Sequence, residues 1–124
     1  MGEEKESIIQ TKSFAFAIRI VKVSKWLIEN HKAYALADQL LRSGTSIGAN
    51  VEEAEGGFTK KDFSARIGIA YREARETRYW LKLLFATGYL SEEQYQSLYN
   101  DCQELIKILA SIQKTTKQNL NDNR

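Results

Sequence analysis

Two glutamates three residues apart, Glu73 and Glu76, form a carboxylate pair that could carry out acid/base chemistry. Trp80 follows Glu76 by four residues, so on a helix these side chains share one stripe. Acid/base catalysis also needs a reacting group within hydrogen-bond reach, and no nucleophile, metal partner or cleft signature accompanies the pair. We therefore predict no catalytic residues and expect an ion-pair network of these glutamates with Arg42 or Arg72, covered by Trp80.

Three other reactive patterns are incomplete. The single histidine, His31, has no glutamate three residues before it, so it lacks the Glu-x-x-His pairing that metal sites in helical bundles use. The single cysteine, Cys102, falls on an apolar helical stripe, where a small core residue is expected rather than a reactive thiolate. No glycine-rich segment is followed by the Lys-Ser/Thr pair of a phosphate-binding loop. The sequence predicts no metal site and no cofactor.

Basic residues interleaved with an aromatic residue occupy a strip beside the carboxylates. Cations contact the phosphates of a nucleic acid, and an aromatic ring can stack on an unpaired base. The alternative is a solvated helix face, because Glu76 lies four residues after Arg72 and could neutralise it. Arg66 lies near the start of the same segment. The candidate nucleic-acid-binding residues are Lys60, Lys61, Arg72, Arg75, Tyr79 and Lys82.

An earlier segment carries a polar stripe that begins at Arg42. One interpretation is a solvated face. The other is a contact between subunits, in which Arg42 and Asn50 form hydrogen bonds across an interface. The candidate interface residues, taken from this stripe, the carboxylate stripe and the first apolar segment, are Phe16, Val23, Trp26, Arg42, Ser46, Asn50, Glu53, Glu73, Glu76 and Trp80.

Four amphipathic segments position these residues, and we expect the apolar seams of the last three segments to face inward. These seams run through Leu40 and Ile47, Leu81 and Leu84, and Leu105 and Leu109. The chain of 124 residues suits one domain core, and the absence of proline permits long helices. Capping patterns at Thr59 and Ser91 predict helix starts, and Gly56-Gly57 and Gly88 predict helix ends in the left-handed conformation that glycine favours. We predict an all-α, antiparallel up-and-down four-helix bundle over residues 7–114, followed by a frayed polar tail at 115–124. The expected helices cover about 7–30, 33–55, 59–88 and 91–112.

The first segment has an unusually wide apolar arc. Its apolar positions cover roughly half of the helix circumference at about 100° per residue, more than a surface helix of a monomer normally buries. We therefore expect this helix to meet a second partner surface in addition to the core. The apolar positions are Phe14, Phe16, Ala17, Ile20, Val21, Val23, Leu27 and Ile28.

Charge and hydropathy limit the environment of the protein. The 18 basic and 16 acidic side chains give a net charge of +2, so nucleic-acid binding would require a local patch. No apolar run approaches the roughly 20 residues that cross a bilayer, and residues 1–6 lack the pattern of a signal peptide. We expect a cytoplasmic protein without a membrane partner, and one cysteine agrees with a reducing compartment.

Two long stretches resemble a bacterial family of four-helix-bundle proteins, encoded within intervening sequences of 23S ribosomal RNA genes. They are LRSGTSIGANVEEA at residues 41–54, and AYREARETRYWLKLL at 70–84 followed by GYL at 88–90. The resemblance runs from Lys12 to about Lys114 and implies a ring-type homo-oligomer, a pentamer, with a ribosomal-RNA-linked role. More distantly, the chain is similar to accessory proteins of diversity-generating retroelements, which implies a ring that presents basic surface to RNA and a reverse transcriptase.

Two functions stay open at this point. The first is a non-enzymatic, oligomeric helical scaffold that binds structured RNA or a nucleoprotein through a repeated basic surface. The second is a protein-protein interaction module whose ring recruits another polypeptide and binds no nucleic acid. An enzyme ranks third. The feature that separates the first two is whether the cations of the third helix in successive subunits lie on one face of the ring.

Overall fold

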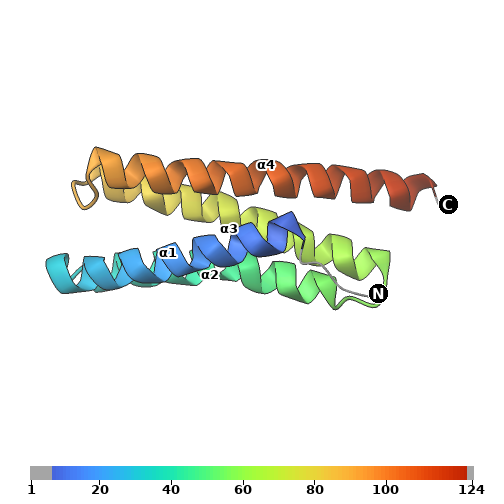
Figure 1. Ribbon diagram of the computed structural model, residues 1–124, viewed down its shortest axis with the longest axis horizontal. Coiled ribbons are helices and arrows are strands. Elements are labelled where there is room, and N and C mark those ends of the chain that lie inside the picture. Colours follow the sequence, from blue (N-terminus) through green and yellow to red (C-terminus); the bar gives the residue numbers. More distant parts are fainter. Residues whose placement is uncertain (1–6, 123–124) are drawn as a thin grey trace.

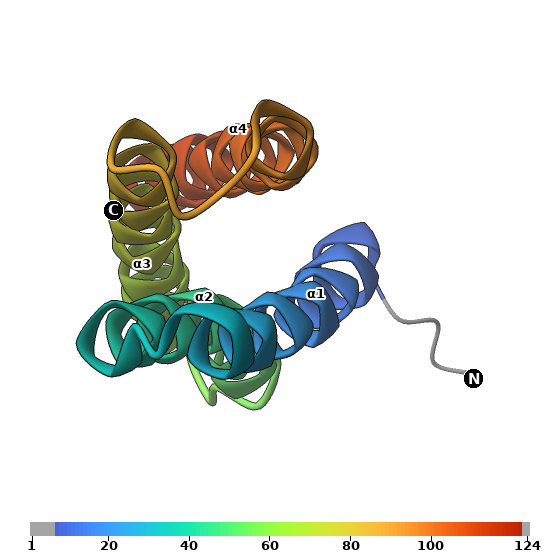
Figure 2. The ribbon, with the colours of Figure 1, turned by 90° about the vertical axis from the view of Figure 1, so that its left-hand side faces the viewer.

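The computed structural model describes residues 7–122, which form four helices in an up-and-down bundle (Figure 1). Each helix packs against the next one in the chain, whereas α1 and α4 have the smallest contact (Figure 2). The predicted all-α, antiparallel four-helix bundle is confirmed. The helices are α1 (Ile8–His31), α2 (Tyr34–Glu55), α3 (Lys60–Ala86) and α4 (Glu92–Asp122).

Side-chain caps begin α1, α3 and α4, and the caps of α3 and α4 lie where the sequence patterns predicted them, whereas α2 begins without one. The Ser91 hydroxyl accepts from the backbone N–H of Gln94 at 3.1 Å, and the Gln94 side chain accepts from the Ser91 N–H at 2.8 Å. The Thr59 hydroxyl accepts from the N–H of Asp62 at 3.0 Å, and Ser7 caps α1. These bonds satisfy N–H groups of the first turn that have no partner within the helix.

The helix ends differ in part from the prediction. Gly88 has a φ of 87°, so the end of α3 uses the left-handed freedom of glycine. Gly56 follows α2 with a φ of −93°, which any residue can adopt, so the left-handed end predicted at Gly56-Gly57 is wrong. The left-handed residue after α1 is instead Lys32, with a φ of 52°.

The polar segment after residue 114 continues α4 instead of fraying. The helix extends to Asp122, so the predicted frayed tail is wrong for residues 115–122, while residues 123–124 lie outside the described part of the chain. Thr116 is buried, and its hydroxyl donates to the carbonyl of Ile112 at 2.7 Å. The burial of Thr116 gives the polar turns an anchor on the bundle that hydrophobic periodicity did not indicate.

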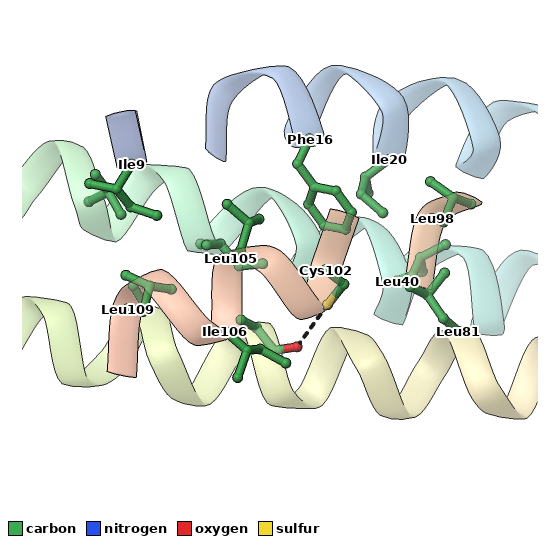
Figure 3. Packing of buried hydrophobic residues seen from close by; sticks show 14 of the residues in the cluster. Ile9, Phe16, Ile20, Leu40, Leu81, Leu98, Cys102, Leu105, Ile106 and Leu109 are labelled. Atoms are coloured by element: carbon green, nitrogen blue, oxygen red, sulfur yellow. Dashed lines mark hydrogen bonds between the residues drawn. The ribbon is translucent and has the colours of Figure 1, made fainter. Parts of the chain in front are cut away.

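The core consists of the inward stripes of all four helices (Figure 3). The predicted seams of α2, α3 and α4 are confirmed, because their central members are almost completely inaccessible to solvent. Fully burying one large apolar side chain contributes about 1.5–3 kcal/mol to folding. The largest buried side chains include Phe16, Ile20, Leu27, Leu40, Ile47, Ile67, Leu81, Leu84, Leu105 and Leu109.

The wide apolar arc of α1 is divided between the core and an outward face. Phe16 is 2% exposed and shares the core with Ile20, so its prediction as an interface residue is wrong. The stripe that contains Phe16 and Ile20 faces inward because it also carries small residues, such as Ser13, which let α1 approach α2 closely. Phe14 and Ile18, on the other side, are 68% and 43% exposed.

Gly44 of α2 packs tightly against Ile20 of α1. A β-carbon at this position would lie 2.8 Å from two side-chain carbons of the buried Ile20. Replacing a helical glycine by alanine normally stabilises by about 1 kcal/mol, whereas overpacking a core costs about 1–3 kcal/mol. We therefore expect Gly44→Ala to lower the free energy of unfolding, as measured by urea denaturation.

Gly48→Ala is the matched control for this change. Its β-carbon would lie 3.4 Å from the nearest atom of Ser13, close to ordinary van der Waals contact, so we expect a neutral or slightly stabilising effect. A Gly44→Ala protein more stable than the parent would contradict the tight packing of Gly44 on Ile20.

Candidate nucleic-acid interface

The predicted basic strip lies on the outward side of α3. Its residues border a shallow hollow of about 470 Å³, and the structure adds Arg78, which the sequence analysis missed. Lys60 and Lys61 are exposed in the first turn of α3 and do not line this hollow, since Lys61 is about 16 Å along the helix axis from Arg72. The hollow is lined by Arg72, Arg75, Glu76, Arg78, Tyr79 and Lys82.

The carboxylates of α3 are engaged with α2. Arg42 forms an ion pair with Glu73 at 3.3 Å and a second one with Glu76, and the Trp80 indole N–H donates to Glu76 at 3.0 Å. The ion-pair network expected for this stripe is therefore present, with Arg42 as the basic partner. Glu76 lies beside the strip, but its ion pair is with Arg42 and not with Arg72. The sequence left open a solvated helix face on which Glu76 neutralises Arg72, and this arrangement argues against that alternative.

The cations of the hollow have no ion-pair partner within residues 7–121. The ion pairs in that part of the chain join α2 to α3 or α1 to α4, as in the 2.6 Å contact between Arg19 and Asp101. The hollow is therefore a place where positive charge accumulates without a neighbouring carboxylate, apart from the already paired Glu76. Its unpaired cations are Arg72, Arg75, Arg78 and Lys82.

Two of these arginines are oriented by uncharged neighbours. The Arg75 guanidinium lies 5.9 Å from the centre of the Tyr71 ring, within cation–π range. Arg78 donates a hydrogen bond to the side-chain oxygen of Gln103 on α4. Neither contact removes the positive charge, so the guanidinium groups are held in place and keep their charge for an anionic ligand.

Exposed lysines of α4 extend the positive surface. Lys107 and Lys114 follow Gln103 by four and eleven residues, so they project from the side of α4 that meets Arg78. Neither lysine has an ion-pair partner in the described part of the chain. The hydrophobic periodicity of the sequence could not show that these lysines lie beside the α3 cations, because their proximity depends on how α3 and α4 pack.

The polar stripe of α2 forms its hydrogen bonds within the chain. The Ser46 hydroxyl donates to the carbonyl of Arg42 at 2.6 Å, and the Asn50 amide donates to the carbonyl of Ser46 at 2.8 Å. Arg66 of α3 donates to Asn50 at 3.4 Å, and Glu53 is exposed. No unsatisfied group in this stripe therefore requires a second subunit.

Val23 and Trp26 lie on the side of α1 that faces α4. They line a groove with Arg19 and Leu98 and are partly covered by the core. The outward apolar face is formed by other residues, which the sequence analysis did not select although Phe14 and Val21 belong to its apolar arc. Phe14 and Tyr34 border hollows of about 520 and 480 Å³ between α1 and α2. We call Phe14, Ile18, Val21 and Tyr34 the outer apolar face.

The remaining reactive side chains occupy structural positions. The thiol of Cys102 donates to the carbonyl of Ala74 at 3.2 Å, and burial raises the pKa of Cys102 to about 12 (Figure 3). His31 is the last residue of α1 and packs edge-on between Trp26 and Tyr89, with ring centres 5.1 and 5.4 Å away. Residues 7–121 contain no group of three or more His, Cys, Asp and Glu side chains that could hold a metal ion.

None of the helices in the described residues has both the length and the apolar character needed to cross a membrane. The fold and its surface define a small four-helix bundle with a basic strip on α3 and an apolar face across α1 and α2.

This chain belongs to the family described as 23S rRNA-intervening sequence protein, whose sequence pattern matches residues 5–111. The resemblance found in the sequence is thereby confirmed. A similar crystal structure is that of a protein with unknown function from the S23 ribosomal protein family of Bacteroides thetaiotaomicron. It is 48% identical with a TM-score of 0.85, and the match covers 86% of this chain and 99% of that one. No curated protein matches the chain.

Proposed function

We propose that this protein is a non-enzymatic, oligomeric scaffold of the cytoplasm that binds structured RNA, alone or within a nucleoprotein, through its α3 basic strip. The observation that carries the proposal is the separation of charge on α3. Glu73 and Glu76 pair with Arg42, whereas Arg72, Arg75 and Lys82 on the outward side have no acidic partner in residues 7–121.

Assembly supplies the affinity that one strip lacks. A single strip reaches only a few phosphates and would bind RNA weakly at physiological salt. Linked weak sites raise avidity by roughly 100-fold or more when one ligand spans them. A homo-oligomer, which the family resemblance suggests is a pentameric ring, would repeat the strip, and the outer apolar face offers each subunit a contact surface.

The alternative is a protein-protein interaction module that binds no nucleic acid. The outer apolar face favours it, because contiguous exposed apolar surface often marks a site where another protein binds. In that case the α3 cations would act only as a solvated surface.

The double substitution Arg75→Gln and Lys82→Gln tests the RNA-binding function. Each neutralised phosphate releases counterions, so removing two contacts per subunit should weaken binding and reduce the slope of log affinity against log salt by about two for each subunit that the RNA engages. Both side chains are exposed, so oligomer mass and melting temperature should change little. Fluorescence anisotropy with a structured RNA over a series of salt concentrations measures the effect.

The matched control is Lys22→Gln with Lys32→Gln, which removes the same charge from exposed positions in α1 and directly after it, outside the stripe of the outer apolar face. We expect this control to keep most of the RNA affinity and salt dependence. If the parent protein binds neither structured RNA nor DNA at low salt, the RNA-binding proposal fails and the protein-recruiting alternative replaces it.

A further inference from the structure

Two exposed aromatic rings flank Lys82, the last cation of the strip along α3. Tyr79 lies three residues before Lys82 and Phe85 three residues after it, so each ring is a neighbour of the lysine on the helix surface. Tyr79 is 57% exposed and Phe85 is 38% exposed. The two rings start about 9 Å apart along the helix axis, at about 1.5 Å per residue, and about 120° apart around it, with Lys82 between them. The order along α3 is therefore aromatic ring, cation, aromatic ring.

The Phe85 ring is held by a stack of aromatic residues from α4. It lies parallel to the Tyr95 ring, with centres 4.4 Å apart and an interplanar angle of 2°. Tyr99 supports Tyr95 from the next turn, at 5.2 Å between ring centres. Because Tyr95 covers one face of Phe85, the exposed area of Phe85 belongs to the opposite face and the ring edge. That face extends the stack toward solvent.

The Tyr79 ring is positioned by its neighbour on α3. It meets the Trp80 ring in a T-shaped contact, with centres 5.1 Å apart and an interplanar angle of 72°. Trp80 is itself anchored by its hydrogen bond to Glu76. Both rings of the pair around Lys82 are thus partly oriented before any ligand arrives, which lowers the entropy cost of stacking on a base.

The geometry points to unpaired nucleotides as the ligand of this surface. We propose that Tyr79 and Phe85 each stack on one base of a single strand, while Lys82 binds a phosphate of the strand between those two bases. The arrangement of ring, cation and ring matches the order of base, phosphate and base in a single strand. In a duplex the base faces are covered by neighbouring bases, so a duplex could use only the cations. Structured RNAs present unpaired nucleotides in their loops and bulges.

This inference rests on the proposed RNA-binding function and narrows it to single-stranded segments. Cations alone would bind a single strand and a duplex through the same phosphate contacts. Base stacking on aromatic side chains adds about tenfold in affinity for each stacked base, and tolerates any base sequence. The parent protein should therefore favour the single strand.

The test compares a single-stranded uridine oligomer of about 20 nucleotides with an RNA duplex of the same length. We expect the parent to bind the single strand at least about tenfold more tightly than the duplex. The double variant Tyr79→Leu with Phe85→Leu keeps apolar bulk but removes both rings. It should lose about tenfold or more in affinity for the single strand and change little for the duplex.

Two controls separate this inference from the function on which it rests. Phe58→Leu removes an exposed ring from the loop between α2 and α3, away from the hollow and outside the outer apolar face, and should leave both affinities unchanged. The Arg75→Gln, Lys82→Gln variant should weaken binding of both RNAs. If that cation variant loses RNA affinity while the aromatic variant binds the single strand as tightly as the parent, single-strand recognition is wrong and RNA binding stands. If no RNA binds, both proposals fail.

Discussion

Truncation of Leu81 to alanine is expected to destabilise the bundle by about 2–5 kcal/mol. Leu81 is 0% exposed and packs in the core, near Leu40 and Leu98 (Figure 3). The loss combines the burial of the leucine side chain with the cavity left behind, because the surrounding helices relax only partly. This is a large part of the 5–15 kcal/mol that stabilises an ordinary domain. Urea denaturation at a fixed protein concentration measures it.

Leu83→Ala provides a control within the same helix. Leu83 lies two residues from Leu81 and is only partly buried, so we expect a loss of about 1 kcal/mol or less. If Leu81→Ala unfolded at the same urea concentration as the parent protein, the inward position of Leu81 would be refuted.

The second large effect concerns assembly through the outer apolar face. We expect light scattering after gel filtration to give the parent a mass several times 14.2 kDa. Phe14→Asp combined with Ile18→Asp should reduce it to that of the monomer, because an apolar contact cannot accommodate unpaired carboxylates without a cost of several kcal/mol. Loss of the ring should also weaken RNA binding by about 100-fold.

Phe58→Asp is the control for this experiment. Phe58 is the most exposed of the large apolar residues, in the loop between α2 and α3 and outside the outer apolar face. Its substitution should leave the oligomer mass unchanged. A parent protein that is monomeric at micromolar concentration would contradict the ring and the avidity that depends on it.

Local patterns predicted most of the fold. The Ser91–Gln94 cap and the seams through Leu40, Leu81 and Leu105 depend on residues three or four apart, so the sequence contains all the information that they require. The position of the basic strip on one helix face followed from the same periodicity. The end of α4 was missed, because a polar segment with one anchoring residue, Thr116, has no apolar period to detect.

By itself the sequence determined four helices, their inward stripes on α2, α3 and α4, and a set of cations on one side of α3. The tertiary structure alone decided which half of the apolar arc of α1 is buried, because Phe14 and Phe16 are equally apolar and the choice depends on close packing against Gly44. It also decided that Glu76 pairs with Arg42 and not with Arg72. The choice between Arg42 and Arg72 depends on distances between helices. The spacing of residues along one helix does not determine those distances.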